Sequence, residues 1–350
     1  MSSKEHCVPK FDLATLGWDA DLASHLTANL QPARVVAGHR GEVDVATEDG
    51  RIRVAVPRRF ARDGQDVAVG DWVGLATGAV QEVLPRRSAL IRHAAGKATR
   101  AQVVAANVDI VFVVTSVGPD LDLRRLERYL VTIWESGARP ELILSKIDRV
   151  DDATAFAREV ATVAPDVPVH TVSAVTGEGC DAVLARITRG TTAVLVGSSG
   201  VGKSTLLNRF AGADVMSTGE VRLDDDEGRH TTTHRELILL PNGGILIDTP
   251  GIRELQLWSA EEGLEAAFSD IESLVATCRF SDCSHESEPG CAVQAAIADG
   301  TLTEQRYASW RKLQAELQVI AARQDALVAR DEKRKWKLLS ADEKTRTRNR

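Results

Sequence analysis

Residues 192–205 read Thr-Ala-Val-Leu-Val-Gly-Ser-Ser-Gly-Val-Gly-Lys-Ser-Thr, an apolar run followed by a glycine-rich loop. A strand, a G-x-x-x-x-G-K-S loop and a helix in this order let backbone N–H groups surround phosphates at a helix N-terminus. Lys203 would reach the β- and γ-phosphates, and Ser204 would bind Mg²⁺. A glycine-rich structural turn is the alternative interpretation. We expect the phosphate site to comprise Gly197, Ser198, Ser199, Gly200, Val201, Gly202, Lys203, Ser204 and Thr205.

A second segment, Leu144-Ser-Lys-Ile-Asp148, ends another apolar run. A carboxylate here can accept the ring N–H and the exocyclic amine of guanine, a pair that adenine does not offer. An exposed loop carboxylate is the alternative. Because Asn is usual where Ser145 stands, we expect weaker affinity for the base. A further strand ends in Ser-Ala-Val-Thr-Gly at 173–177, which would buttress the base. The predicted base-binding residues are Ser145, Lys146, Ile147, Asp148, Ser173 and Ala174.

A third group of residues would respond to the γ-phosphate. The apolar run at 245–247 ends in Asp248, suited to holding Mg²⁺ through water, and the Gly251 N–H could meet the phosphate. Ile252 replaces the Gln that orients water in GTPases of the Ras type, so we expect slow intrinsic hydrolysis. In the loop at 228–235, Thr232, with Thr231 a close second, is predicted to be the second Mg²⁺ ligand. His230 is the candidate for orienting water, although it also fits a surface histidine.

Four soft ligands lie within 14 residues of one another near the C-terminus. Three thiolates and one imidazole match a closed tetrahedral Zn²⁺ site, in which the metal is structural rather than catalytic. Buried free thiols are the alternative, and Cys7 and Cys180 are expected to be ordinary thiols. Zinc binding would supply part of the folding energy of this small helical region. The predicted ligands are Cys278, Cys283, His285 and Cys291.

The chain as a whole is predicted to be an α/β protein with additional domains. Five short β-prone runs between residues 33 and 90 indicate a small barrel of the oligonucleotide-binding (OB) type, although the pattern also permits an SH3-like barrel. Alternating strand and helix signals up to Gly251 predict a mostly parallel sheet. The predicted domains are an extension without clear elements at 1–31, a barrel at 32–92, a nucleotide-binding domain at 93–254, a helical zinc-binding domain at 255–329 and a basic tail at 330–350.

Composition sets limits on the partners of the chain. No stretch approaches the roughly 18 apolar residues of a membrane span, and the polar start lacks a secretory signal, so cytoplasm is the expected compartment. The net charge of −7 and pI of about 5.7 argue against a nucleic-acid partner. Locally, however, residues 330–350 hold nine basic and four acidic residues, a net charge of +5. Solvated surface is an equally good explanation of these charges.

The guanine-binding segment precedes the phosphate loop, and this rotated order resembles the circularly permuted GTPases of the ribosome small subunit-dependent GTPase A family. The resemblance is carried by the N-terminal barrel, the motif order, Gly228-Arg-His-Thr-Thr-Thr233, Asp248-Thr-Pro-Gly251 and the stretch from Phe280 to Val293. It implies a GTPase that binds the 30S ribosomal subunit late in assembly, that the subunit stimulates hydrolysis, and that hydrolysis is coupled to release. It also implies contacts of the barrel and zinc domain with 16S rRNA. We expect a monomer that binds GTP or GDP with Mg²⁺ and one Zn²⁺.

Two other functions fit parts of the sequence. A P-loop ATPase or kinase would show no guanine preference, and a zinc-dependent RNA-binding module with a structural nucleotide would show no turnover stimulated by small subunits. The sequence is also compatible with a divergent paralogue of this family that acts on another target. Because Gly251 leads directly into the zinc region, we hypothesise that loss of the γ-phosphate is transmitted to that domain.

Overall fold

The computed structural model describes residues 11–93, 101–119, 121–212, 235–248 and 260–322. The chain divides into two compact units, Met1–Gln256 and Leu257–Arg350. No helix within the described ranges is long and apolar enough to cross a membrane.

The centre of the first unit is a parallel sheet in the order β10-β9-β8-β11-β13, with β12 antiparallel at its edge. Every residue of β8 and β11 is buried, which explains the apolar runs at 110–114 and 193–196, because a strand covered on both faces has no solvent-facing side. The bounds are β8 (Ile110–Ser116), β9 (Arg139–Ser145), β10 (Val169–Thr171), β11 (Thr192–Val196), β12 (Glu236–Leu239) and β13 (Ile245–Asp248).

Helices of this unit pack on the sheet through apolar faces. Alternate residues of β8, namely Ile110, Phe112 and Val114, share one core cluster with Val183 of α5 and Phe210 of α6. Helix α3 packs on β8 and β9, and Asp122 caps it by accepting a hydrogen bond from the Arg125 N–H. The bounds are α3 (Leu123–Glu135), the 3₁₀ turn η2 (Ile147–Arg149), α4 (Thr154–Ala161), α5 (Cys180–Leu184) and α6 (Lys203–Ala211).

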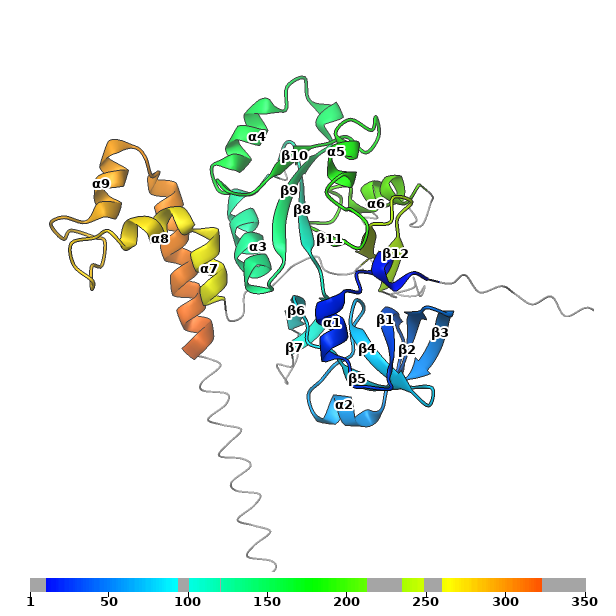
Figure 1. The fold of residues 1–350 in the computed structure, drawn as a ribbon. Helices are drawn as coiled ribbons and strands as arrows, with labels where there is room; N and C mark the ends of the chain where they lie inside the picture. Colours follow the sequence, from blue (N-terminus) through cyan, green and yellow to red (C-terminus); the bar gives the residue numbers. More distant parts are fainter. Residues whose placement is uncertain (1–10, 94–100, 120, 213–234, 249–259, 323–350) are drawn as a thin grey trace, which may run out of the picture. The chain divides into compact units, whose positions relative to one another are not determined.

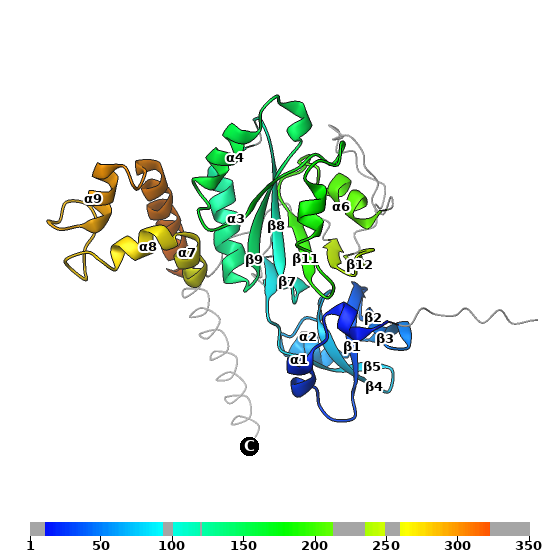
Figure 2. The same ribbon diagram turned by 45° about the horizontal axis from the view of Figure 1, so that its top comes forward.

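The predicted barrel is present and is of the OB type. Its five strands close through pairings of β1 with β4 and of β3 with β5, around a core of Val, Ala, Leu and Phe side chains. A short helix, α2 (Arg58–Arg62), lies between the third and fourth strands. The strands are β1 (Gln31–Gly38), β2 (Glu42–Thr47), β3 (Gly50–Ala55), β4 (Trp72–Ala76) and β5 (Ala79–Val83). A two-stranded ribbon, β6 (Ala89–His93) and β7 (Ala101–Ala106), lies between the barrel and the parallel sheet (Figure 1, Figure 2).

The expectation that residues 1–31 hold no clear element is wrong for the part that the structure describes. The 3₁₀ turn η1 (Leu13–Leu16) and helix α1 (Ala20–His25) are each capped by a preceding aspartate, Asp12 and Asp19. Apolar residues of both elements are buried, and the Trp18 ring lies 4.8 Å from that of Trp72 in the barrel. The signal was the aspartate before each apolar stretch, which is an N-cap pattern.

The barrel continues the parallel sheet directly. Strand β12 pairs with β13 on one side and with β1 of the barrel on the other, where Ala37 is opposite Glu236. Glu236 also accepts a hydrogen bond from Arg51 of β3 at 2.7 Å. The parallel sheet is therefore joined to the barrel through β12, both by backbone pairing with β1 and by the Arg51–Glu236 hydrogen bond.

Arg34 of β1 is a buried cation, with only 1% of the residue exposed. Its guanidinium donates to the carbonyls of Leu16, Gly70 (3.3 Å) and Asn107 (3.2 Å) and to the Thr192 hydroxyl (2.8 Å). Burial lowers its pKa to about 10, so it stays protonated at neutral pH. Four separate segments of the chain thus share one charged group.

The second unit is helical. Its elements are α7 (Glu261–Ala267), α8 (Ser269–Val275), α9 (Ala292–Asp299) and a final helix over residues 304–322. Arg306 of that helix is buried, lies 3.9 Å from the centre of the Phe268 ring, and donates to the Ala267 carbonyl and to Asp270. This pairing joins the final helix to the turn between α7 and α8.

We predict that Arg34→Leu lowers the free energy of unfolding of the first unit by at least about 3 kcal/mol, because each buried acceptor left without a donor costs about 1–3 kcal/mol. Urea unfolding followed by tryptophan fluorescence measures this. Arg62→Leu is the control, since the Arg62 side chain is 80% exposed. Equal midpoints for the two variants would show that Arg34 is not the link described.

Candidate nucleotide site and metal cluster

The predicted nucleotide-binding segments meet at one edge of the sheet. Ser145 ends β9, the segment at 173–177 follows β10, Gly197 follows β11, and Asp248 ends β13. These four strands are parallel, so their carboxyl ends lie at the same edge, where open α/β sheets bind ligands. The rotated order along the chain does not affect this convergence.

The phosphate loop has positive φ angles at glycines, where a side chain would be strained. Gly197 has a φ of +139°, and a Cβ there would lie 2.2 Å from the Val114 carbonyl oxygen. Gly202, at φ +101°, is the N-cap of α6, so the N–H groups of the first turn, at Lys203, Ser204 and Thr205, begin at the loop. The Lys203 ammonium donates to the carbonyls of Gly197 (2.8 Å) and Ser198 (2.6 Å). This combination of a helix N-terminus and a cation can bind an anion.

The remaining loop residues differ in exposure. Ser199 and Gly200 are exposed, whereas Val201 is buried and packs in the core cluster beneath α6. Ser204 and Thr205 are half-buried at the first turn of the helix. The loop is therefore anchored at Val201 and open at its tip.

Asp148 and Ser173 are brought together as base-binding residues would be. The Ser173 hydroxyl, fully buried, donates to one carboxylate oxygen of Asp148 at 2.5 Å. Asp148 itself is exposed within η2, and Lys146 before it has a left-handed backbone with a φ of 60°. One oxygen of the carboxylate is thus fixed by Ser173, which holds the group in position for a partner with paired N–H donors. Of the other predicted base-binding residues, Ile147 is buried and Ala174 is half-buried.

Ser145 has a role that could not be inferred from its replacing the usual Asn. Its side chain is buried, and its single hydroxyl proton is shared between the Thr115 carbonyl (2.9 Å) and the Val201 carbonyl (2.6 Å). Val201 belongs to the phosphate loop, so this hydroxyl links the base loop to the phosphate loop across 56 residues. Ser145 therefore positions the two loops, and its predicted contact with a base stays a prediction.

Sequence reasoning missed Arg209 of α6. Its guanidinium donates to the carbonyls of Ala174 (3.1 Å), Val175 (3.5 Å) and Thr176 (3.5 Å), and it packs so closely on Gly177 that a Cβ there would lie 1.9 Å from its nitrogen. Arg209 therefore fixes the predicted base-buttressing segment onto the helix that follows the phosphate loop. The carbonyl groups that Arg209 contacts are more than 30 residues away in the sequence, so no short motif could have predicted this role.

The predicted γ-phosphate group is only partly described. Asp248 is half-buried at the end of β13, opposite Glu236 of β12. Gly251, His230, Thr231 and Thr232 lie outside the described residues. Cys7 and the tail at 330–350 do so as well.

The four predicted zinc ligands form one cluster in the second unit. Their ligand atoms all lie within 4.8 Å of one another. The His285 Nδ1 lies 3.5 Å from the Cys278 sulfur and 3.6 Å from that of Cys291. Bonds of about 2.3 Å from Zn²⁺ to sulfur and about 2.0–2.1 Å to nitrogen in a tetrahedron place sulfur and nitrogen about 3.6 Å apart. The donor set and spacing therefore fit Zn²⁺ with no open position.

Hydrogen bonds around the cluster hold His285 and the adjoining loop. The His285 carbonyl accepts from the Gln294 amide (2.6 Å) and the Tyr307 hydroxyl (3.0 Å), so the ligand loop is tied to α9 and the final helix. The Glu288 carboxylate accepts from the N–H groups of Ser284 (2.9 Å), Glu286 (3.1 Å) and Ser287 (3.1 Å). Such outer contacts orient metal ligands.

Comparison with known proteins identifies close relatives over nearly the whole chain. The family model for the RsgA GTPase matches residues 83–258. A Streptomyces avermitilis protein named small ribosomal subunit biogenesis GTPase RsgA is 46% identical over 344 residues, covering 95% of this chain and 93% of the relative. A protein of the same name from Methanosarcina acetivorans is 42% identical, covering 93% and 91%.

Solved structures agree with these relatives. YjeQ from Thermotoga maritima matches with a TM-score of 0.64 and 28% identity over 82% of this chain and 98% of its own. YloQ, described as a circularly permuted GTPase, matches in fold with a TM-score of 0.61 at 24% identity, over 83% of this chain and 96% of its own. The ABC transporter family model also matches, at residues 180–345, but that range begins after both segments that are predicted to bind the base.

We predict that Ser145→Ala weakens binding of GTP and of xanthosine triphosphate alike, by about tenfold, because a hydrogen bond that positions both loops is lost without changing the base contact. Asp148→Asn is the matched contrast. Its amide replaces the acceptor that guanine needs and should shift preference toward xanthosine triphosphate. Competition binding with a fluorescent nucleotide measures both. A change of base preference in Ser145→Ala would contradict the positioning role.

We predict one zinc per chain in the purified protein, measured by elemental analysis, and its loss in Cys278→Ser. Chelation should lower the midpoint of thermal unfolding of the second unit, because metal binding contributes folding energy there. Cys180→Ser is the control, since Cys180 is a buried thiol of the first unit that lies outside the cluster. Equal zinc content in both variants would exclude Cys278 as a ligand.

Proposed function

The chain belongs to the RsgA GTPase family, and from this membership we propose that it hydrolyses GTP and acts in biogenesis of the small ribosomal subunit. The observation that carries the proposal is the pair of buried serine hydroxyls at the nucleotide edge. Ser173 holds the Asp148 carboxylate, and Ser145 holds the base loop to the phosphate loop. An ATPase of the same phosphate-loop class has no need of this arrangement around a carboxylate acceptor.

The proposed roles at the site follow from position. The phosphate loop with Lys203 would hold the phosphates, while Asp148, with Lys146, Ile147, Ser173 and Ala174 around it, would hold guanine. Mg²⁺ would be bound by Ser204 and Thr232, with Asp248 acting through water, and it would neutralise charge on the β- and γ-phosphates. We propose that the Gly251 N–H contacts the γ-phosphate and that His230 orients water in place of the absent Gln. The Cys₃His cluster would hold a structural Zn²⁺.

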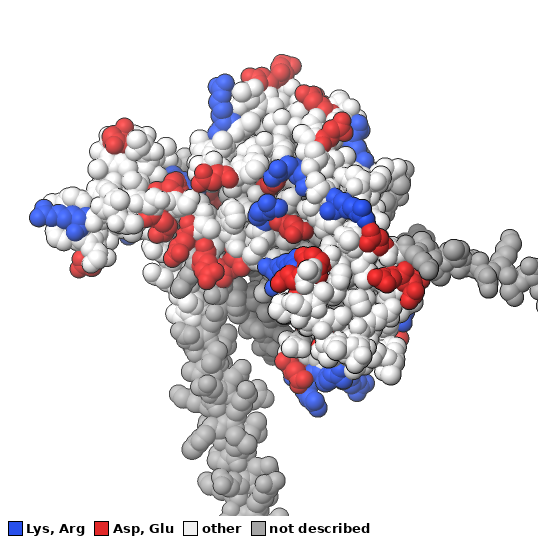
Figure 3. Space-filling view, in the orientation of Figure 1, with Lys and Arg blue, Asp and Glu red and all other residues white. Residues whose placement is uncertain are grey.

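The proposed partners are the 30S subunit and its 16S rRNA. Positive and negative side chains are interspersed over the visible face of the first unit, and basic ones gather over α2 of the barrel, which carries Arg58, Arg59 and Arg62 (Figure 3). Because the net charge of −7 does not attract RNA as a whole, we propose that RNA phosphates are contacted locally, by basic side chains such as these. We propose a cytoplasmic monomer that leaves the subunit once GTP is hydrolysed.

We predict that purified 30S subunits raise the rate of GTP hydrolysis at least about tenfold, because the slow intrinsic site gains groups or order only on the subunit. Phosphate release with GTP and ATP, with and without subunits, measures this. Lys203→Ala is the control and should abolish turnover in every case. Equal rates with and without 30S would contradict the ribosomal assignment, and equal use of ATP would contradict the guanine assignment.

A further inference from the structure

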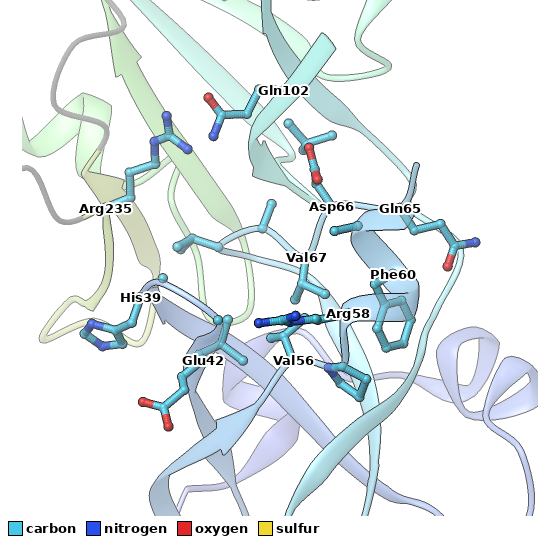
Figure 4. A pocket seen from close by; sticks show the side chains of 18 residues that line it. His39, Glu42, Val56, Arg58, Phe60, Gln65, Asp66, Val67, Gln102 and Arg235 are labelled. Atoms are coloured by element: carbon cyan, nitrogen blue, oxygen red, sulfur yellow. The ribbon is translucent and has the colours of Figure 1, made fainter. Parts of the chain in front are cut away.

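Arginine side chains of the first unit differ in whether their donors converge on one segment. Arg235 and Arg58 line a cavity of about 440 Å³, but they lie on opposite sides of it (Figure 4). Arg209 of α6, in contrast, donates to three consecutive carbonyls, those of residues 174–176, at 3.1, 3.5 and 3.5 Å. One guanidinium therefore holds the tip of the base-buttressing segment, residues 173–177.

The course of the backbone at this tip depends on Arg209. Within the described part of the chain, the carbonyls of residues 174–176 accept from no other donor. Packing does not hold the tip in place of these bonds, since Val175 is 76% exposed. Arg209 itself is fixed by its helix, because its neighbours Asn208 and Phe210 are buried. Loss of the guanidinium would leave the tip without a hydrogen bond from α6.

The start of the same segment is held without Arg209. The Ser173 N–H donates to the Glu178 carbonyl, and the Ser173 carbonyl accepts from the Gly177 N–H, both at 2.9 Å. The Ser173 hydroxyl donates to the Asp148 carboxylate at 2.5 Å. Removing Arg209 should therefore release the tip and leave the bond between Ser173 and Asp148 in place.

Holding the carbonyls also sets the direction of two free donors. The N–H groups of Ala174 and Val175 have no acceptor among the residues that the structure describes. In a trans peptide the N–H points opposite to the carbonyl of the preceding residue, and no described peptide bond is cis. The Ser173 carbonyl is held by the Gly177 N–H and the Ala174 carbonyl by Arg209. The two N–H groups are thus directed away from these partners.

Guanine needs both kinds of partner on one edge. It presents N–H donors, which Asp148 is proposed to accept, and a 6-oxo acceptor beside them. The free N–H groups at residues 174 and 175 belong to the segment that the Ser173 hydroxyl joins to Asp148. Adenine carries an amine at the same position, and this amine would bring a donor against these donors.

We propose that Arg209 is a positioning residue for guanine recognition, which fixes the base-buttressing segment so that its free N–H groups meet the 6-oxo group of the base. This role rests on the proposed function, because it concerns how the same site selects its nucleotide. Arg209 acts through the backbone of residues 174–176 and not by touching the base. It lies on the helix that begins at the phosphate loop, so one helix holds both the phosphate loop and the segment beside the base.

The role is tested with three nucleoside diphosphates that differ in the base. GDP and inosine diphosphate carry the 6-oxo group, and 2-aminopurine riboside diphosphate lacks it. Competition with a fluorescent GDP, whose own Kd is measured for each variant, gives the three affinities. In Arg209→Leu we expect GDP and inosine diphosphate to bind about fivefold more weakly, the loss of one hydrogen bond, and the 2-aminopurine nucleotide to bind as before. Equal weakening of all three would overturn the proposal, because it would indicate general damage or lost attraction for the phosphates.

Arg186→Leu is the matched control. Arg186 donates to Glu141 of β9 at 2.7 and 2.9 Å, so its loss also removes arginine hydrogen bonds from the first unit, at residues outside the base-buttressing segment. We expect the order and spacing of the three affinities to stay as in the unmodified protein. A selective loss of GDP and inosine diphosphate in Arg186→Leu equal to that in Arg209→Leu would overturn the specific role of Arg209.

Arg209→Lys separates geometry from charge. It keeps the positive charge but replaces the planar fork of donors by a single ammonium. We expect GDP to remain at least about twofold weaker than in the unmodified protein, and full recovery would overturn the geometric role. The unmodified protein distinguishes the two proposals. Equal affinity for GDP and the 2-aminopurine nucleotide there contradicts the proposed function, whereas a GDP preference that Arg209→Leu keeps in full contradicts only the role of Arg209.

Discussion

The first unit depends on the buried guanidinium of Arg34. A charge that is removed from water must be satisfied by hydrogen bonds, and Arg34 obtains them from four segments, at Leu16, Gly70, Asn107 and Thr192. These belong to the N-terminal segment, the barrel, the connection between β7 and β8 and the first residue of β11. None of the four can move away without leaving the charge exposed to an apolar interior. The barrel and the parallel sheet therefore belong to one compact unit and share this buried charge.

Strand β12 connects the nucleotide edge of the parallel sheet to the barrel. It pairs with β13, which ends in Asp248, and with β1 of the barrel, so the strand end predicted to lie near the γ-phosphate is connected to the barrel by backbone hydrogen bonds. The order of motifs along the chain suggested transmission to the zinc region through Gly251, which remains a prediction. The connection through β12 is not visible in that order, because it joins residues 37 and 236.

Local signals accounted for much of the fold and for the core of the candidate site. The phosphate loop, the strand ends that carry Ser145 and Asp248, the barrel and the Cys₃His cluster are all readable from short patterns with fixed spacing. Residues that act over long distances could not be found in this way. Arg34 and Arg209 matter because of the carbonyl groups that the fold brings near them, and an isolated arginine has no motif. The same reason explains why β12, a strand of only four residues between β13 and β1, was not predicted.

Ser145 shows why the base loop could be recognised from the spacing of its residues, although a serine stands where Asn is usual. The geometric requirement is a donor that reaches the Val201 carbonyl of the phosphate loop from the end of β9, and a hydroxyl meets it when the strand end lies close enough. Ser173 likewise reaches Asp148 across 25 residues. The Ser173 bond joins the ends of β10 and β9, which are neighbours in the sheet, whereas the Ser145 bond reaches past β8 to the loop that follows β11. A rotated sequence can keep the same nucleotide site because these short bonds depend on where the strand ends lie in the sheet, whereas the attachment of neighbouring domains depends on where the chain enters and leaves the sheet.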